Sequence, residues 1–187
     1  MDFILETLRN PKSTGAIAPS SKRLVNLILK EADLENAKVV VELGPGTGVF
    51  TEKILENLKG DTKFYAIETN KSFSDSLKEQ FPEVVFHHGS AEDIKKYLGT
   101  HSISYCDRII SGLPWTAFSV EVQRRLLSKI YDSLEPGGIF VTFSYYPFNH
   151  LPRGKGFKNL LSEYFSDVYR TEIVSNIPPA FVYVCRK

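Results

Sequence analysis

The fold of this chain is decided by the stretch Val39-Val40-Val41-Glu42-Leu43-Gly44-Pro45-Gly46-Thr47-Gly48. Its β-branched run predicts a buried strand of a parallel sheet. Residues 49–58 then repeat apolar side chains at the spacing of an amphipathic helix. Between them, the glycines permit a tight turn and let a ligand approach the main chain, because no Cβ covers it. The loop therefore joins a strand to a helix and offers a backbone surface for a ligand.

A second acid, Glu68, stands where the next strand, residues 63–68, is expected to end. One carboxylate can accept hydrogen bonds from both hydroxyl groups of a ribose. Together with the acid of the first strand, it predicts a nucleotide-like, positively charged cofactor. The nicotinamide fingerprint requires glycine where Val49 stands, and the loop lacks the Gly-Lys-Ser/Thr of a phosphate-binding P-loop. The alternative is an ordinary strand turn with a solvated Glu68.

Length, charge and cysteine content limit the number of domains, the kinds of partner and the cellular setting that the chain can have. A chain of 187 residues with a formal net charge of +1 suits one domain without a strong global field for nucleic acid or membrane. Cys106 and Cys185 lie far apart in apolar runs, which favours reduced, buried thiols over a disulfide framework or a metal site. No apolar run approaches a bilayer-spanning length, and no signal peptide is recognisable at the start. We expect a cytoplasmic protein that is not integral to a membrane.

Strand-like runs alternate with helical patterns along the chain. The runs are residues 38–43, 63–68, 84–88, 107–111, 138–144, 168–174 and 181–186. This alternation predicts a single-domain α/β fold with an open, mostly parallel, doubly wound sheet. The short connection 175–180 requires an antiparallel return for the last strand. A long helix is expected over 120–134, and an irregular loop over 145–156 followed by a helix to about residue 165.

Residues 42–48 resemble the cofactor motif of the class I S-adenosylmethionine-dependent methyltransferases. The resemblance implies a Rossmann-like fold of seven strands with an antiparallel last strand. It also implies S-adenosylmethionine as cofactor, S-adenosylhomocysteine as its product, and Glu68 as the ribose ligand. Many members carry Asp where this chain has Ser90, so a contact to adenine falls mainly to the Ala91 amide. The cofactor-binding residues expected by resemblance are Glu42, Gly44, Gly46, Thr47, Gly48, Glu68, Ser90, Ala91 and Ser111.

The run Ser111-Gly112-Leu113-Pro114-Trp115 follows the fourth strand, at the carboxyl edge where such sheets bind ligands. In methyltransferases that modify the exocyclic nitrogen of adenine, Asn/Asp-Pro-Pro-Tyr or Asn-Leu-Pro-Tyr stands here. This chain has Ser111 at the first position and an inserted Gly112. The departure weakens the interpretation that a base amine is the acceptor.

Three segments, residues 8–23, 111–118 and 176–183, together look like the bacterial phospholipid N-methyltransferase family, which is related to the rRNA adenine dimethyltransferases. The resemblance spans almost the whole chain. It implies stepwise methyl transfer from S-adenosylmethionine to the amine of phosphatidylethanolamine. We expect residues 1–34 to form an N-terminal helical segment, acting as an acceptor lid or membrane contact, and residues 35–187 to form the methyltransferase domain.

That chemistry selects the candidate catalytic residues Trp115, Tyr145, Tyr146 and His150. The lipid ammonium must lose a proton before it can accept a methyl group, and Tyr145, Tyr146 and His150 are candidate acceptors. Aromatic faces bind methylated ammonium groups, which suits Trp115 and the two tyrosines. The alternative is that these aromatics only pack the sheet edge.

Partners follow from the same interpretation. Arg153 and Lys155, or the basic residues of the start, suit a phosphodiester head group or an anionic membrane surface. Residues 3–9 are amphipathic enough to lie in a bilayer interface at the inner face of a membrane, or else to cover the cofactor pocket. The alternative for the charged loop is simple solvation. No protein partner is implied.

Three other functions stay open. An rRNA adenine N6-dimethyltransferase shares the cofactor motifs, but that family usually adds a C-terminal helical domain and a basic surface, whereas this chain ends at its last strand with near-neutral charge. A small-molecule amine methyltransferase and a non-catalytic regulatory module are the others. No metal site is expected, because the adjacent His87 and His88 point to opposite faces of a strand.

Overall fold

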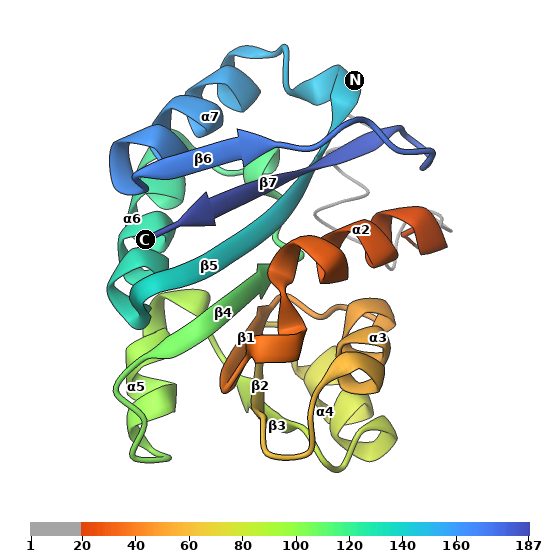
Figure 1. Cartoon of the computed structure of the whole chain (residues 1–187), viewed down its shortest axis with the longest axis vertical. Coiled ribbons are helices and arrows are strands. Elements are labelled where there is room, and N and C mark those ends of the chain that lie inside the picture. Colours follow the sequence, from red (N-terminus) through yellow and green to blue (C-terminus); the bar gives the residue numbers. More distant parts are fainter. Residues whose placement is uncertain (1–19) are drawn as a thin grey trace.

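The structure, a computed structural model, describes residues 20–187, and its strands form one seven-stranded sheet in the order β3-β2-β1-β4-β5-β7-β6 (Figure 1). The strands are β1 Val39–Leu43, β2 Lys63–Glu68, β3 Val85–His88, β4 Cys106–Ser111, β5 Leu134–Tyr145, β6 Asp167–Arg170 and β7 Ala180–Arg186. Strands β1 to β5 pair in parallel, and β7 pairs antiparallel with both β5 and β6. The predicted seven-stranded α/β fold with an antiparallel last strand is confirmed. The predicted contact of residues 3–9 lies outside the described residues.

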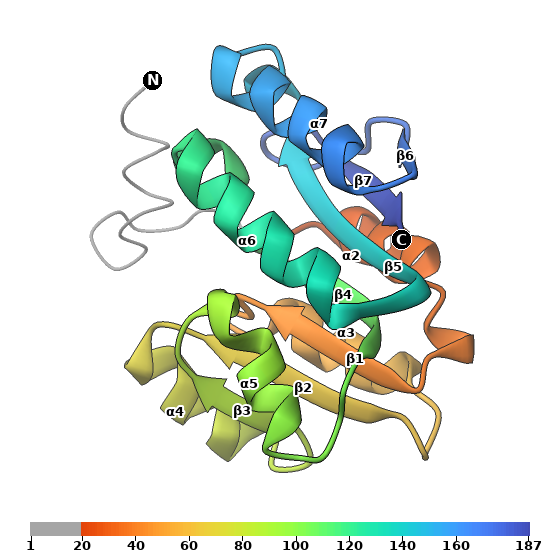
Figure 2. The same cartoon turned by 90° about the vertical axis from the view of Figure 1, so that its left-hand side faces the viewer.

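Helices cover both faces of the sheet, with α2, α3 and α4 on one side and α5, α6 and α7 on the other (Figure 2). Their bounds are α2 Lys22–Ala32, α3 Val49–Asn57, α4 Lys71–Gln80, α5 Ile94–Gly99, α6 Val120–Ser133 and α7 Pro152–Tyr164. Single 3-10 turns are η1 Leu34–Asn36, η2 Ala91–Asp93, η3 Trp115–Ala117 and η4 Tyr146–Phe148. The side chains of Ser21, Asn70 and Ser119 accept backbone N–H groups and so begin α2, α4 and α6. None of the helices within residues 20–187 is long and apolar enough to cross a bilayer.

Strand β1 lies between β2 and β4, which creates the point where the chain direction across the sheet reverses. The loop after β1 turns toward α3, and the loop after β4 turns toward η3 and α6 on the other face. Such a reversal opens a crevice at the carboxyl ends of the strands. The order of the strands therefore places the glycine-rich loop, residues 44–48, at the position where ligands bind in this class of sheet.

Three element boundaries differ from the sequence prediction by more than one residue. Strand β5 begins at Leu134 rather than 138, because Leu134 pairs with Cys106 before an irregularity in the register. Strand β6 ends at Arg170 rather than 174, and beyond it Val174 makes only an isolated bridge to Ala180. Helix α7 begins at Pro152, inside the predicted irregular loop, because proline at the first helical position needs no hydrogen-bond acceptor for its nitrogen.

Helix α2 belongs to the same core as the sheet. Leu24 and Ile28 are buried in one apolar cluster with Val40 of β1 and Val182 of β7. Cys106 and Cys185 are free and buried in the strands, as the sequence predicts, and burial raises the pKa of both thiols. The two cysteines therefore act as apolar core residues.

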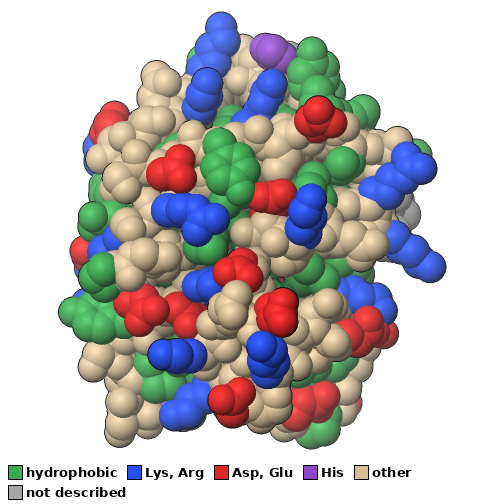
Figure 3. Space-filling view, viewed as in Figure 1, with side chains coloured by type: hydrophobic (Ala, Val, Ile, Leu, Met, Phe, Trp, Pro, Cys, Tyr) green, Lys and Arg blue, Asp and Glu red, His purple; other side chains and the backbone are tan. Residues whose placement is uncertain are grey.

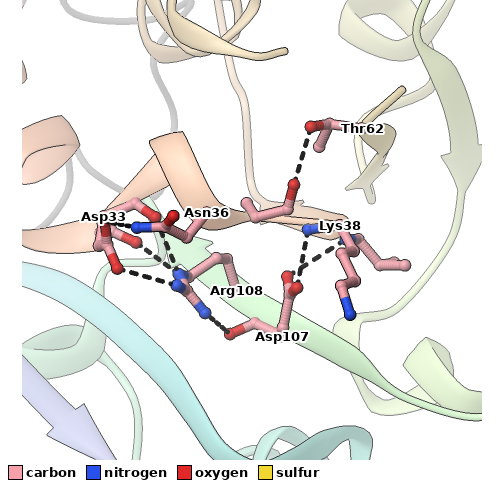
Figure 4. Close-up of polar contacts among 9 residues, drawn as sticks. Asp33, Asn36, Lys38, Thr62, Asp107 and Arg108 are labelled. Atoms are coloured by element: carbon pink, nitrogen blue, oxygen red, sulfur yellow. Dashed lines mark hydrogen bonds and ion pairs between the residues drawn. The ribbon is translucent and has the colours of Figure 1, made fainter. Parts of the chain in front are cut away.

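An arginine in β4 ties α2 to the sheet (Figure 4). The Arg108 guanidinium donates to the Ala32 carbonyl at 2.7 Å and to the Asp33 carboxylate at 3.1 Å. Its neighbour Asp107 accepts from the backbone N–H of Lys38 at 2.7 Å, just before β1. These bonds satisfy groups at the C-terminal end of α2, which have no partner inside the helix. Adjacent residues of one strand thus fix both the preceding helix and the central strand.

We expect Arg108→Met to lower the free energy of unfolding by about 2 to 3 kcal/mol, because carbonyls at the end of α2 lose their donor in a largely buried setting. The control is Arg124→Met, whose ion pair with Glu163 is half exposed and is worth less than about 1 kcal/mol. Urea denaturation of both variants measures the difference. Equal losses would show that Arg108 does not anchor α2.

Candidate active site

A cavity of about 740 Å³ lies at the carboxyl edge of the sheet. It is bounded by the loops after β1, β2, β3 and β4 and by the first turns of α4 and α6. Its lining residues are Gly44, Gly46, Ile67, Glu68, Thr69, Asn70, Phe73, Gly89, Ser90, Ala91, Glu92, Gly112, Leu113, Pro114, Ala117, Phe118, Ser119, Val122 and Leu126. Four loops that are far apart in the sequence thus enclose one space, large enough for a small-molecule ligand.

Glu68 lies at the centre of the hydrogen bonds that join these loops. One carboxylate oxygen, Oε2, accepts from the Gly46 N–H at 3.1 Å, and Oε1 accepts from the Asn70 N–H at 2.7 Å. The residue is buried yet lines the cavity. Its oxygens have further lone pairs, so the carboxylate can also accept from hydroxyl groups of a ligand. Glu68 therefore holds the glycine-rich loop and faces the ligand space.

The other acid of the motif, Glu42, is fully buried behind this loop. Its Oε2 accepts from the Thr51 hydroxyl at 2.7 Å, while no donor in the described part of the chain reaches Oε1. Burial raises the pKa of Glu42 to about 8; the Thr51 bond opposes this rise and the charge of Glu68 adds to it. A buried acceptor without a partner is costly unless a ligand or a proton compensates it.

The glycines of the loop have different tasks. Gly44, Gly46 and Gly48 all have positive φ, at +70°, +58° and +85°. A Cβ on Gly46 would meet nothing within 4 Å, whereas one on Gly48 would lie 2.6 Å from Leu77 of α4. Gly46 thus leaves its surroundings open beside the cavity, and Gly48 allows α3 and α4 to pack.

Gly112 brings the loop after β4 against the loop after β1. Its N–H donates to the Leu43 carbonyl at 2.8 Å, and a Cβ on it would lie 2.8 Å from the Gly44 carbonyl oxygen. Real Cβ atoms do not approach backbone oxygen so closely, so any side chain here would push the two loops apart. The residue that the sequence comparison treats as an insertion is therefore a packing requirement.

A second, smaller cavity of about 30 Å³ adjoins the first. Both are lined by Gly112, Leu113 and Pro114, which separate them. The other walls of the small cavity are Trp115, Thr116, Phe143, Ser144 and Tyr145. Burial raises the pKa of the Tyr145 phenol, so this hydroxyl keeps its proton at neutral pH. The two cavities form a large polar-edged space beside a small aromatic one.

Trp115 is a buried wall of the small cavity. Its indole N–H donates to the Ser111 hydroxyl at 3.2 Å, and its ring stacks on Phe157 of α7 with 4.6 Å between the ring centroids. Gln123 of α6 donates to its carbonyl at 2.7 Å. Ser111, predicted as a cofactor-binding residue, thus lines neither cavity and holds the indole instead. The Trp115 side chain therefore both packs in the core and lines the small cavity.

The remaining sequence-predicted residues are divided between the cavities and the surface. Ser90 and Ala91 line the large cavity, and the Ser90 hydroxyl also accepts from the Glu92 N–H at 3.1 Å. Thr47 is exposed at the tip of the loop. Tyr146 and His150 are exposed and pack edge to face, with 5.1 Å between ring centroids, outside both linings. The structure therefore brings Trp115 and Tyr145 together and leaves Tyr146 and His150 apart from them.

Several lining residues escaped the sequence analysis. Phe73 had a local signal, since it follows the cap Asn70 in the first turn of α4. Phe118 lies just before α6, and Val122 and Leu126 lie within it; all three line the cavity, and no local pattern indicates this. Thr51, the partner of Glu42, lies in the first turns of α3, where a polar residue interrupts the apolar face.

His87 has a neighbour that the sequence did not predict. Its Nε2 lies 3.3 Å from Nε2 of His101, and its ring stacks on Tyr97. Within residues 20–187, no group of three or more His, Cys, Asp or Glu side chains is arranged to hold a metal ion. The histidine pair therefore belongs to an aromatic cluster on the α5 side of the sheet.

Known proteins resemble this chain at two levels. The family of ribosomal RNA adenine dimethylases matches residues 19–90. An ornithine lipid N-methyltransferase from Singulisphaera acidiphila is 30% identical over 98% of this chain and 94% of its own length. A ribosomal RNA small subunit methyltransferase A from Sulfurihydrogenibium is 39% identical, but over 41% of this chain and 29% of that protein.

Solved structures share the fold at low identity. The N-methyltransferase NodS from Bradyrhizobium japonicum, in complex with S-adenosylhomocysteine, has a TM-score of 0.71 at 14% identity and covers 98% of this chain and 97% of its own. The O-methyltransferase TomG from Streptomyces achromogenes, in complex with S-adenosylmethionine, has a TM-score of 0.71 at 18% identity, covering 99% and 88%.

The residues of the large cavity fit S-adenosylmethionine, the cofactor of this class of fold. Glu68 lines the cavity and offers oxygens for ribose hydroxyls. The open surroundings of Gly46 leave the backbone accessible. Apolar side chains such as Leu113 and Phe118 complete a wall for a flat ring.

We expect Gly46→Ala and Gly48→Ala to separate binding from stability. Both substitutions strain a residue with positive φ by about 1 kcal/mol or more. Only the second collides with Leu77 and Phe81, so it should cost a further 1 to 3 kcal/mol, roughly, in unfolding free energy. In calorimetry, Gly46→Ala should weaken S-adenosylhomocysteine binding more than about tenfold while the fold is kept. Unchanged affinity in Gly46→Ala would place the ligand elsewhere.

Glu42 should make stability depend on pH. Its pKa is raised from 4.5 in the unfolded chain to about 8 in the fold, so its stabilisation is fully present below the unfolded pKa and is lost as pH rises through about 8. We expect the unfolding free energy of the cofactor-free protein to fall with pH by up to about 1.4 kcal/mol per unit in this window. Glu42→Gln should flatten that slope in urea denaturation at several pH values. Parallel profiles would mean that Glu42 is ionised in the fold.

Proposed function

The chain belongs to the class I S-adenosylmethionine-dependent methyltransferases, and we propose that within this family it N-methylates the amine of a membrane lipid. The observation that carries the proposal is the small aromatic cavity that adjoins the cofactor cavity at residues 112–114. The relative that matches along the whole chain, an ornithine lipid N-methyltransferase, supports the same class of acceptor. Both point to an amine acceptor.

S-adenosylmethionine supplies the methyl group when it is bound. The chain's own residues must present an amine that has lost its proton, and must then hold a product with more methyl groups. Tyr145 retains its phenolic proton, so we assign it to orienting the amine rather than to taking its proton. The faces of Tyr145 and Phe143 can bind the methylated cation. Trp115 forms a further, buried wall of this small cavity.

Phosphatidylethanolamine is the acceptor that we favour within this class. Arg153 and Lys155 are exposed in the first turns of α7, where a phosphodiester would find positive charge. The same two residues would serve a carboxylate of an amino-acid lipid, since guanidinium and ammonium groups bind both anions. The choice between the two head groups therefore needs a direct comparison of products.

Adenine N6-dimethylation of ribosomal RNA is the second candidate. Its support is the match of residues 19–90 to the rRNA adenine dimethylases, and this region carries the glycine-rich loop and Glu68. The region that would meet the base differs, because Ser111 binds the Trp115 indole and Gly112 packs on Gly44. Small amines and a regulatory, non-catalytic role remain the further alternatives.

The proposal is tested with vesicles that contain phosphatidylethanolamine, ornithine lipid and an anionic lipid, incubated with S-adenosylmethionine beside a parallel reaction with small-subunit ribosomal RNA. We expect mass spectrometry to find lipids heavier by one or more methyl groups and no methylated adenine. The relative yields of the two lipids identify the head group. Methylated adenine without lipid product would reverse the assignment.

We expect Tyr145→Ala to lower turnover on detergent-dispersed lipid at least about tenfold, because the small cavity loses a wall that orients the amine. The affinity for S-adenosylhomocysteine should stay within about twofold, since Tyr145 lies outside the lining of the large cavity. Tyr105→Ala, an exposed tyrosine just before β4, is the control and should leave both values unchanged. An unaltered turnover in Tyr145→Ala would remove the small cavity from the acceptor site.

A further inference from the structure

Three segments that are distant in the sequence meet at one end of the molecule. They are residues 20–23 at the start of α2, 145–158 after β5, and 173–180 before β7, and we call them the apical surface. The Ser21 N–H donates to Asn176 at 2.8 Å, and the Ser21 hydroxyl donates to the Ser175 carbonyl at 2.7 Å. The Tyr146 N–H donates to the Pro179 carbonyl at 2.8 Å. These hydrogen bonds therefore hold the three segments side by side.

The apical surface carries positive charge in a chain that is nearly neutral. Its exposed basic residues are Lys22, Arg23, Arg153, Lys155 and Lys158. The three segments contain no Asp or Glu, and Glu172 flanks the third. Figure 3 shows Lys and Arg side chains gathered over α7 at the top and over the start of α2 at the right, while acids and bases mix over the middle. The charge is therefore local rather than spread over the protein.

Exposed apolar side chains, above all Ile177, lie among these basic residues. Ile177 is 79% exposed, more than any other large apolar side chain of the described residues. Ile173 and Tyr146, from two of the same segments, are also exposed. The loop is well defined, since the Asn176 side chain donates to the Pro178 carbonyl at 2.8 Å. An exposed isoleucine on a braced loop is costly in water and suits an apolar partner.

This surface borders the proposed acceptor cavity. Tyr145, a wall of that cavity, pairs with Ala180 in the sheet, and both residues belong to the apical surface. A head group in the cavity would therefore contact a wall residue that belongs to the apical surface. The basic residues, the exposed Ile177 and the cavity wall Tyr145 thus all belong to the three segments of the apical surface.

We propose that the apical surface docks on an anionic lipid bilayer, with Ile177 entering the interface and the basic residues around it contacting lipid phosphates. The proposal rests on the proposed lipid acceptor and names where the membrane lies. Interfacial binding of this kind combines buried apolar area with attraction to anionic lipid. A nucleic acid would use the same charges but would gain nothing from Ile177.

The test is sedimentation of the full chain with vesicles of phosphatidylethanolamine and phosphatidylglycerol, compared with neutral phosphatidylcholine vesicles. We expect tighter binding to the anionic vesicles. Ile177→Ser should weaken it about tenfold through lost apolar burial, whereas Val85→Ser, an exposed apolar residue at the far edge of the sheet, should not. Equal binding of these two variants would overturn the proposal.

Two double charge reversals test the role of the basic residues of the apical surface. Lys22→Glu with Lys158→Glu should weaken anionic vesicle binding more than about fivefold for each charge reversed, while Lys63→Glu with Lys96→Glu, on β2 and α5, should have a much smaller effect. If both double variants lost vesicle binding equally, binding would depend on the net charge of the protein alone. The apical surface would then not be the membrane contact.

Turnover on detergent-dispersed lipid separates this proposal from the proposed function. Ile177→Ser should keep wild-type turnover there and lose it only on vesicles. Loss of turnover in detergent as well would assign Ile177 to the head-group site and overturn the docking role. Absence of lipid product from the wild-type protein in both media would defeat the lipid acceptor, whereas the sedimentation result would still report on docking.

Discussion

The contact between two loop backbones, at Gly44 and Gly112, is the constraint on which the site depends. The Gly112 N–H bonds to the end of β1, and no side chain fits between Gly112 and the Gly44 carbonyl. Because β1 lies between β2 and β4, this contact stands where the sheet edge opens on both faces. It makes residues 112–114 a partition that is shared by the large cavity and the aromatic cavity. A methyl group can pass between two ligands only across such a narrow boundary.

The two carboxylates of the motif lie in unequal environments. Glu68 uses its oxygens to hold the glycine-rich loop and Asn70, and so remains an acceptor at the cavity wall. Glu42 is sealed behind the loop, with one oxygen on Thr51 and the other without a donor among the described residues. Desolvation raises the pKa of Glu42, and a cationic ligand nearby would favour its charged form. A carboxyl group whose pKa is raised by burial is a pattern typical of functional sites.

The sequence predicts the fold, and it also indicates several residues that line the large cavity, because both rest on local patterns. The glycine-rich loop, Glu68, and the short 175–180 connection each specify a turn or a pairing within a few residues. Other lining residues are harder to predict, since Trp115 combines burial with cavity lining and since Phe118 and Val122 line the large cavity through the tertiary placement of α6 and the residues before it. The predicted irregular loop over 145–156 is wrong in its second half. Pro152 begins a helix there, and the glycines that follow it are poor helix formers, so the sequence does not indicate this start. The apical surface depends on hydrogen bonds across more than 150 residues of sequence, such as that from Ser21 to Asn176, and no local pattern indicates them.

The most direct test of this account is a crystal structure of the protein with S-adenosylhomocysteine. We expect the ligand in the cavity of about 740 Å³, with its ribose hydroxyls on Glu68, its adenine near Ala91, and its sulfur toward the partition at Gly112–Pro114. That arrangement would place the reactive end of the cofactor against the aromatic cavity. A ligand bound elsewhere, or one whose sulfur faces Asn70 with the partition empty, would contradict the account.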